Sequence, residues 1–294
     1  MTEPCEPCEP REPCEPREPC EPRGNPLSEP EPWNAIANDY LDVNLPLLGM
    51  FSDAAMEHVQ LAADMRVIDV AAGPGTLACR IAPSVERVDA IDFSAEMLGH
   101  CLTRIAELEL ANIYVRHGDA QALPFPNATF DLGFCMFGIM FFPDRPRAFR
   151  ELYRVLRPGG RALLTSWAPI ERSSYMQTRV DALRAADPNA PNPADIARNV
   201  LTLEDPDLFA KEMRDAGFDD VSVEPVVRER TFADADELFR SLTRGNAPIE
   251  LLRRTLGESV WQERLRGIRR YLETLGPFPI RLALTAWLGQ GRRS

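Results

Sequence analysis

Residues 65–93 read MRVIDVAAGPGTLACRIAPSVERVDAIDF, and this stretch decides the fold class. The segment MRVIDVAA is typical of a buried strand, GPGTLACRIA of a tight turn that leads into a helix, and RVDAIDF of a second strand. The nearly continuous apolar character of both strands indicates that each is covered on both faces. The stretch therefore predicts a βαβ unit with two parallel strands.

The same alternation continues after this unit. Ser94 is a suitable N-cap for a helix AEMLGHCLTRIAELE, because its hydroxyl can accept hydrogen bonds from the first free amides. Further strands are predicted at NIYVRHGD, FDLGFCMF and RALLTSW, with a helix RAFRELYRVL and a sharp turn at residues 158–160 before the last of them. Strands that alternate with helices predict an α/β fold with a parallel sheet covered on both faces.

Helical additions are predicted on either side of this sheet. Residues 33–62 have apolar side chains at helical spacing, interrupted near Pro46, which predicts two helices that form an N-terminal cap. We expect helical insertions at about 169–199 and 234–275. The segment LFAKEMRDAGF predicts a helix that ends at Gly217, VSVEPVV a sixth strand, and IRLALTAWL a final strand.

The N-terminus has a different composition from the rest of the chain. Residues 3–23 are seven consecutive triplets of Glu-Pro-Cys or Glu-Pro-Arg. A proline at every third position removes backbone donors and favours polyproline II, so this segment cannot contribute to a core. We therefore expect a disordered tail at residues 1–32 and a single domain at 33–294.

Composition and charge exclude several classes of partner. The formal net charge of −12 disfavours nucleic acid, because binding gains affinity from the neutralisation of phosphates. The chain shows no secretory signal and no run of about 18 apolar residues, so we expect a cytoplasmic protein without stable membrane insertion. Outside the tail the cysteines are scattered, which predicts neither a disulfide framework nor a metal site. Nothing in the sequence indicates an oligomeric state.

Glycines and carboxylates gather at the predicted strand ends. Gly73 and Gly75 allow a tight turn and the close approach of a ligand, as they would in a dinucleotide-binding fold. Asp69, Asp92 and Asp119 end three successive strands, and such ends line one crevice in an open α/β sheet. A carboxylate at Asp69 would repel a pyrophosphate, whereas it would attract the ammonium and sulfonium groups of S-adenosylmethionine (SAM).

Four segments together resemble the class I SAM-dependent methyltransferases, and in particular their type 11 and quinone-ring C-methyltransferase groups. These segments are VIDVAAGPGTLA, VDAIDFSAEML, GDAQALPFPNATFD and RELYRVLRPGGRALLTSW, and the resemblance spans roughly residues 33–167. It implies a Rossmann-like, doubly wound sheet of seven strands in the order 3-2-1-4-5-7-6, with strand 7 antiparallel.

The resemblance also implies how SAM is held. The glycine loop would lie against the methionine part, the acid that ends the second strand would hold the ribose, and the acid after the third strand would read the adenine. The expected cofactor-binding residues are Tyr40, Asp69, Gly73, Gly75, Asp92, Phe93, Met97, Asp119, Ala120 and Cys135.

Together these features predict methyl transfer to a small-molecule acceptor by in-line displacement. Such a reaction depends mainly on positioning, and His117 is a weak candidate for a general base. We expect an apolar or aromatic acceptor, such as a phenol, a quinol or a secondary metabolite. Its pocket would be formed by the N-terminal helices, residues 136–142 and residues 167–199. A nicotinamide-dependent oxidoreductase and a non-catalytic SAM-binding protein remain alternatives.

Overall fold

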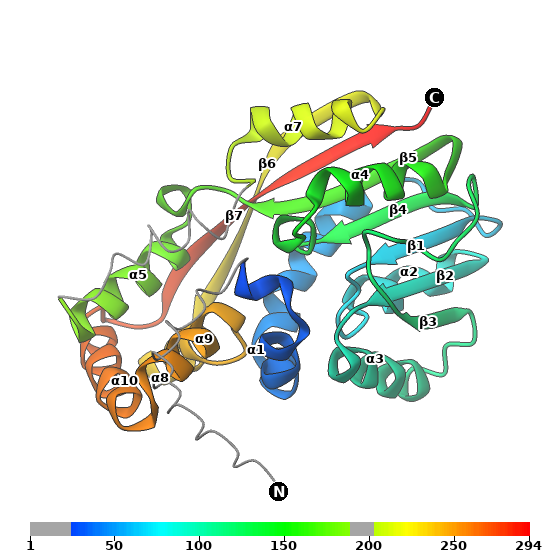
Figure 1. Cartoon of the computed structure of the whole chain (residues 1–294). Helices are drawn as coiled ribbons and strands as arrows, with labels where there is room; N and C mark the ends of the chain where they lie inside the picture. Colours follow the sequence, from blue (N-terminus) through cyan, green and yellow to red (C-terminus); the bar gives the residue numbers. More distant parts are fainter. Residues whose placement is uncertain (1–24, 189–202) are drawn as a thin grey trace, which may run out of the picture.

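The structure is a computed structural model, and it describes residues 25–188 and 203–294. Seven strands form one sheet in the order β3-β2-β1-β4-β5-β7-β6, which confirms the predicted order (Figure 1). The strands are β1 (Arg66–Val70), β2 (Arg87–Asp92), β3 (Ile113–His117), β4 (Phe130–Met136), β5 (Leu156–Trp167), β6 (Asp219–Phe232) and β7 (Ile280–Arg292).

The direction of the strands divides the sheet in two. Strands β1 to β5 pair in parallel, whereas β7 runs antiparallel to both β5 and β6. The predicted antiparallel position of the last strand is therefore confirmed. This order differs from the 3-2-1-4-5-6 order of the dinucleotide-binding fold, because an extra strand is inserted between positions 5 and 6.

Helices cover both faces of the sheet. The α-helices are α1 (Pro30–Glu57), α2 (Thr76–Ile81), α3 (Ala95–Glu107), α4 (Arg145–Val155), α5 (Ser174–Ala186), α7 (Pro206–Asp215), α8 (Ala235–Thr243), α9 (Ala247–Leu256) and α10 (Glu258–Glu273). Short 3₁₀ helices are η1 (Pro26–Ser28), η2 (Ala82–Ser84), η3 (Ile139–Phe141) and η4 (Ile170–Arg172). Successive residues of β1 point to opposite faces, so Val67 packs into the core beside α1 and α2, and Ile68 into the core beside α4 and α7.

Several sequence-based boundaries need correction. Helix α1 runs unbroken through Pro46, although we expected two helices there. Proline removes one helical hydrogen bond, but Val43 and Leu47 on either side of it are buried, and this packing keeps the helix continuous. The turn expected at residues 158–160 is an irregularity inside β5, where the register with β4 shifts and Gly159 has a φ of 86°.

The expected tail boundary also changes. Residues 1–24 lie outside the described residues, but η1 and the start of α1 occupy most of 26–32. Leu27 is buried in the core that includes α1, so the ordered fold begins before residue 33. The end of the expected insertion at 169–199 lies outside the described residues, whereas α8, α9 and α10 account for the one at 234–275.

These later helices gather at the far end of the β6–β7 ribbon, and α1 lies between them and the parallel part of the sheet (Figure 1). Tyr175 of α5 stacks on Phe232 of β6 with ring centroids 5.9 Å apart, and its hydroxyl bonds to Ser241 of α8 at 2.8 Å. Helices α5, α8, α9 and α10 therefore form a helical lobe of the same domain.

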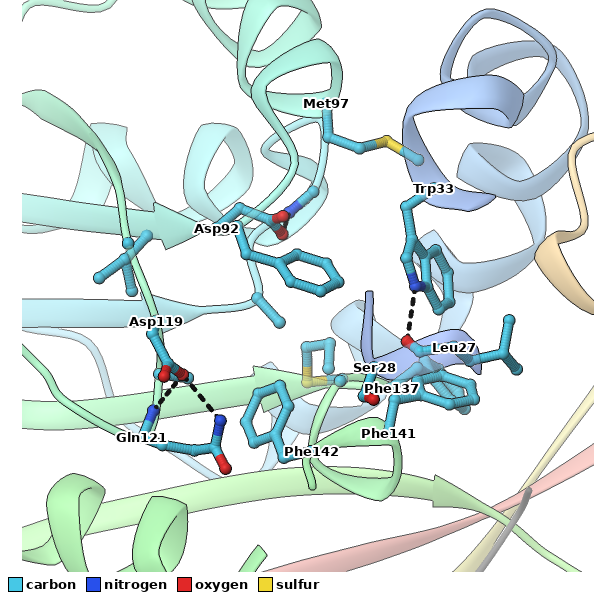
Figure 2. Close-up of a pocket in the computed structure, with 18 of the residues that line it drawn as sticks. Leu27, Ser28, Trp33, Asp92, Met97, Asp119, Gln121, Phe137, Phe141 and Phe142 are labelled. Atoms are coloured by element: carbon cyan, nitrogen blue, oxygen red, sulfur yellow. Dashed lines mark hydrogen bonds between the residues drawn. The ribbon is translucent and has the colours of Figure 1, made fainter. Parts of the chain in front are cut away.

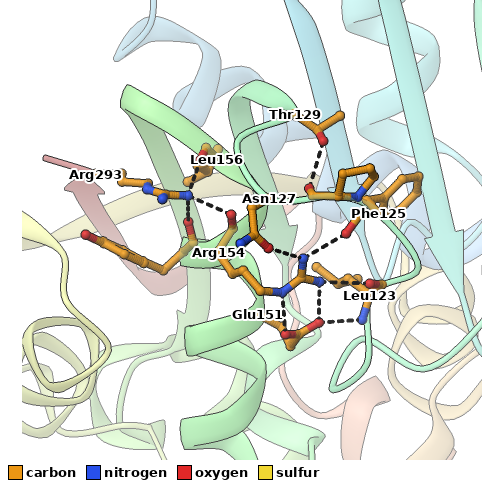
Figure 3. A network of polar contacts seen from close by, with 10 residues as sticks. Leu123, Phe125, Asn127, Thr129, Glu151, Arg154, Leu156 and Arg293 are labelled. Atoms are coloured by element: carbon orange, nitrogen blue, oxygen red, sulfur yellow. Dashed lines mark hydrogen bonds and ion pairs between the residues drawn. The ribbon is translucent and has the colours of Figure 1, made fainter.

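A polar network fixes the connection between β3 and β4 (Figure 3). The Arg154 guanidinium donates to the carbonyl oxygens of Leu123 and Phe125 and to the Glu151 carboxylate. Glu151 in turn accepts from the Leu123 amide at 2.8 Å. Helix α4 thereby holds residues 123–125 in place. These residues follow Asp119, which lies at the carboxyl edge of the sheet.

Candidate functional site

One cavity lies at the carboxyl ends of β1, β2 and β4, beneath η1 and the start of α1 (Figure 2). Its volume is about 730 Å³ when the space of its open mouth is included. Its lining consists of Leu27, Ser28, Trp33, Tyr40, Ala71, Gly73, Ile91, Asp92, Phe93, Met97, Gly118, Asp119, Ala120, Gln121, Met136, Phe137, Gly138, Phe141, Phe142 and Pro143. Asp92 and Asp119 lie on one side of the cavity, and Trp33, Phe137 and Phe141 lie opposite them (Figure 2).

The loop after β1 turns sharply because three of its residues have positive φ. These values are 56° at Ala71, 55° at Gly73 and 72° at Gly75. A Cβ on Gly73 would meet nothing within 4 Å, and this residue lines the cavity. A Cβ on Gly75 would lie 2.6 Å from the Cys101 sulfur, and Gly75 does not line the cavity. The first glycine therefore leaves room for a ligand, whereas the second allows the loop to pack on α3.

Asp92 is the buried acid of the cavity, with 6% of its surface exposed. One carboxylate oxygen accepts from the Gly73 amide and the other from the Ser94 amide, both at 2.8 Å. Burial raises the pKa of Asp92, and these amides act in the opposite direction. The Phe93 amide also acts on this carboxylate, which has about four lone-pair sites in all, so it can still accept from a ligand hydroxyl group.

Asp69 lies behind the glycine loop and does not line the cavity. It is 1% exposed and accepts from the Ala78 amide in α2 at 3.1 Å. Burial is the main cause that raises the pKa of Asp69 to about 7, and the nearby Asp92 charge adds to the effect. Our expectation that Asp69 lines the crevice together with Asp92 and Asp119 is therefore corrected, because its side chain turns toward the α2 N-terminus.

Asp119 and its neighbours form the outer rim of the cavity. Its Oδ1 accepts from the Gln121 backbone amide at 2.8 Å and from the Gln121 side chain at 3.0 Å (Figure 2). Phe93, Met97 and Ala120 line the cavity beside these carboxylates. The rim therefore offers an exposed carboxylate as a hydrogen-bond acceptor and apolar side chains beside it. A flat heterocycle that carries an exocyclic N–H donor could use both.

His117 and Cys135 do not line the cavity. The exposed His117 places its Nε2 2.9 Å from the Phe93 carbonyl oxygen, so the candidate base already has a partner in the neighbouring loop after β2. Cys135 is 1% exposed, and burial raises the pKa of its thiol to about 12. Met136, the last residue of β4, lines the cavity, whereas the Cys135 side chain lies in the core on the other face of the sheet. The cofactor contact expected of Cys135 stays a prediction.

The aromatic part of the cavity joins the N-terminal cap to the end of β4. Trp33 packs edge-on against Phe141, with ring centroids 5.0 Å apart, and its Nε1 donates to the Leu27 carbonyl at 2.9 Å (Figure 2). Tyr40 lines the cavity from the same helix, and burial followed by the Asp92 charge raises the pKa of Tyr40. Its hydroxyl therefore stays protonated at neutral pH.

Only some of the residues expected to form an acceptor pocket line the cavity. Residues 136–142 and helix α1 contribute to the lining, whereas no residue of 167–188 does. Sequence reasoning missed Leu27, Ser28 and Gln121. For Leu27 and Ser28, the sequence signal was the apolar Leu27 itself. It follows the last triplet, marks the end of the repetitive composition and is buried in the structure.

Comparisons with known proteins agree with this geometry. A family profile described as a methyltransferase domain matches residues 67–160. A demethylmenaquinone methyltransferase of Deinococcus radiodurans is 34% identical over 166 residues, which cover 52% of this chain and 67% of the relative. A ubiquinone/menaquinone biosynthesis C-methyltransferase, UbiE, of Dinoroseobacter shibae is 32% identical over 63% of this chain and 78% of the relative.

Solved structures share the fold at lower identity. The YcgJ protein of Bacillus subtilis superposes with a TM-score of 0.52 and 21% identity, over 84% of this chain and 97% of that one. A [4+2]-cyclase, SpnF, has a TM-score of 0.53 and 19% identity over 83% and 80% of the two chains. The sheet order, the glycine loop with its buried acid, and the identity to methyltransferases over most of their length place this chain in the class I SAM-dependent methyltransferase family.

Proposed function

We propose that this protein transfers the methyl group of SAM to a flat, uncharged aromatic acceptor, such as a phenol or quinol ring. The observation that carries the proposal is the continuity of one cavity from the Asp92 carboxylate to the rings of Trp33, Phe141 and Phe142. The names of the quinone-pathway methyltransferases that resemble the chain support this acceptor class.

In the proposed arrangement, the nucleoside occupies the acidic part of the cavity. Asp92 accepts from the ribose hydroxyls, Asp119 accepts from the adenine amine, and Phe93 and Met97 contact the adenine ring. The Gly73 position, which is open to the cavity, leaves room for the methionine part. SAM supplies an activated methyl group, and the negative charge of the two lining carboxylates favours a cationic nucleoside over a phosphorylated one.

The acceptor would lie against the aromatic part of the cavity. Trp33, Phe137, Phe141 and Phe142 offer apolar faces there, and none of the residues in the described lining is a lysine, arginine or histidine. Such a wall favours an uncharged ring and excludes water from the line between nucleophile, methyl carbon and sulfur. Holding these three atoms in line can lower the barrier by on the order of 7 to 11 kcal/mol.

The test combines binding with turnover. Calorimetry should detect SAM and S-adenosylhomocysteine but not NAD, and release of S-adenosylhomocysteine should accompany incubation with phenols or quinols. Phe142→Leu should raise the KM of the acceptor with little change in SAM affinity, whereas Tyr114→Leu, at a site 50% exposed on the sheet edge, should change neither. SAM binding without turnover on any phenol, quinol or amine would indicate a non-catalytic SAM-binding protein instead.

A further inference from the structure

The first turn of α1 contacts both parts of the cavity. Trp33 faces the aromatic part, where its indole N–H holds the Leu27 carbonyl of η1 and its ring packs on Phe141. The next residue, Asn34, bonds to the part of the cavity lined by Asp92, Phe93 and Met97, which we call the cofactor side. Its Oδ1 accepts from the Ser94 hydroxyl at 2.6 Å, across 60 residues of sequence. Two adjacent side chains thus join the cap to two different parts of the site.

Ser94 is central to the cofactor side. Its amide donates to Asp92 at 2.8 Å, and its hydroxyl oxygen accepts from the Met97 amide at 3.2 Å as the N-cap of α3. Phe93 and Met97, on either side of it, line the cavity. Ser94 is fully buried, so its hydroxyl proton needs a protein acceptor, and Asn34 provides it.

The capping role of Ser94 does not itself require Asn34. A serine N-cap needs only its oxygen as an acceptor, and the Met97 amide already satisfies that function. The bond to Asn34 therefore serves the contact between α1 and the Asp92 loop. Because Trp33 and Tyr40 lie two turns apart on one face of α1, fixing the start of the helix fixes both cavity-lining rings.

We propose that Asn34 is a positioning residue that couples the cap to the nucleoside loop, so that the aromatic part of the cavity becomes ordered when SAM is bound. The inference rests on the proposed function only in taking SAM as the ligand of the Asp92 side. In the coupled state, a nucleoside held by Asp92 keeps Ser94 in place, Ser94 keeps Asn34 in place, and the first turn of α1 sets the positions of Trp33 and Leu27. The acceptor would then meet a complete pocket only after SAM has bound.

Hydrogen exchange of the full-length protein with and without SAM tests the coupling. In the wild type, SAM should slow exchange both at residues 93–98 and at residues 27–40. In Asn34→Ala, the protection at 93–98 should remain while the added protection at 27–40 is lost. The SAM dissociation constant should rise by roughly 2- to 12-fold, the equivalent of one net hydrogen bond. Asn34→Asp keeps the accepting oxygen and should restore the protection.

Two controls separate coupling from general loosening of the helix. Asn38 is exposed one turn further along α1, and Asn38→Ala should behave as the wild type. In a Ser94→Ala background, a further Asn34→Ala change should have no additional effect on cap protection, because the partner hydroxyl is already gone. Additive losses in that double variant would overturn the proposal.

The remaining outcomes distinguish this inference from the proposed function. If SAM binds the wild type and protects 93–98 but leaves exchange at 27–40 unchanged, the coupling is wrong while the proposed function stands. If Asn34→Ala retains the full SAM-dependent protection of the cap, the coupling is also wrong. A wild-type protein that shows no SAM binding would overturn both.

Discussion

The cofactor side of the cavity is built by residues close together in the chain, whereas the cap side joins residues that are far apart. Asp69 bonds to Ala78, and Asp92 to Gly73, over 9 and 19 residues. By contrast, Trp33 of α1 packs against Phe141, which lies 108 residues further along the chain, and both rings line the cavity. The glycine loop and its acids therefore follow from local sequence, while the aromatic part of the cavity depends on how the chain folds back.

The largest expected effect concerns the tight packing of the cofactor side. Gly75→Ala should lower the free energy of unfolding by about 2 to 5 kcal/mol, because the new Cβ meets the Cys101 sulfur at a positive φ. Thermal or urea unfolding would measure it. Adding Cys101→Ala to this variant should restore the stability lost through the clash with the sulfur. It should not restore the stability lost through the positive φ of the backbone.

Gly99→Ala is the matched control for that substitution. Its Cβ would meet nothing within 4 Å inside α3, so this change should raise stability by about 0.5 to 1 kcal/mol. Equal losses at the two glycines would show that the loop after β1 is no more tightly constrained than a helix surface.

A second test concerns the buried charge behind the loop. Burial raises the pKa of Asp69 from its ordinary value of 3.8 to about 7. Between pH 3.8 and pH 7, the carboxyl group is therefore protonated in the folded protein and ionised in the unfolded chain. The stability that this group contributes is present below pH 3.8 and is lost as the pH rises to 7. Asp69→Asn should therefore stabilise the protein at pH 8 by as much as about 4 kcal/mol.

The same variant should match the wild type near pH 4, where Asp69 is neutral in the folded state. Unfolding curves at the two pH values make the measurement. A variant less stable than the wild type at pH 8 would show that the Asp69 charge is stabilised by α2 more than burial destabilises it.

The third test separates binding from stability. Asp92→Asn should weaken SAM binding by about 1.5 to 3 kcal/mol, the usual contribution of a hydrogen bond to a charged group. Since burial raises the pKa of Asp92, SAM affinity of the wild type should fall on acidification at a higher pH than an ordinary aspartate would produce. Calorimetric titrations across pH should show this fall in the wild type and its absence in the variant.

The smallest expected effect belongs to the helical lobe. Tyr175→Phe removes the hydroxyl that bonds to Ser241 and should lower the free energy of unfolding by about 0.5 to 1.5 kcal/mol. SAM affinity should not change, because Tyr175 does not line the cavity. A comparable loss of SAM affinity would mean that the lobe and the cofactor side are energetically coupled.

Local sequence was a sound guide wherever one segment makes its own contacts. The βαβ unit at 65–93, the N-cap at Ser94 and the acid at Asp92 were all predicted, because apolar periodicity and capping act over a few residues. The antiparallel position of β7 was predicted from the family resemblance alone, because local patterns do not give the direction of a strand within a sheet. The ligand roles of the predicted residues stay predictions, although seven of the ten line the cavity.

Long-range packing decided the rest. Burial of Val43 and Leu47 keeps α1 whole despite Pro46, the α2 N-terminus draws Asp69 away from the cavity, and the Phe93 carbonyl occupies His117. Leu27 and Asn34 gain their places only when η1 and α1 fold over the sheet. The sequence by itself determined the βαβ unit and the acids that end its strands, because those depend on short-range patterns. Only the tertiary structure decided which side chains line the cavity, because that depends on partners distant in the chain.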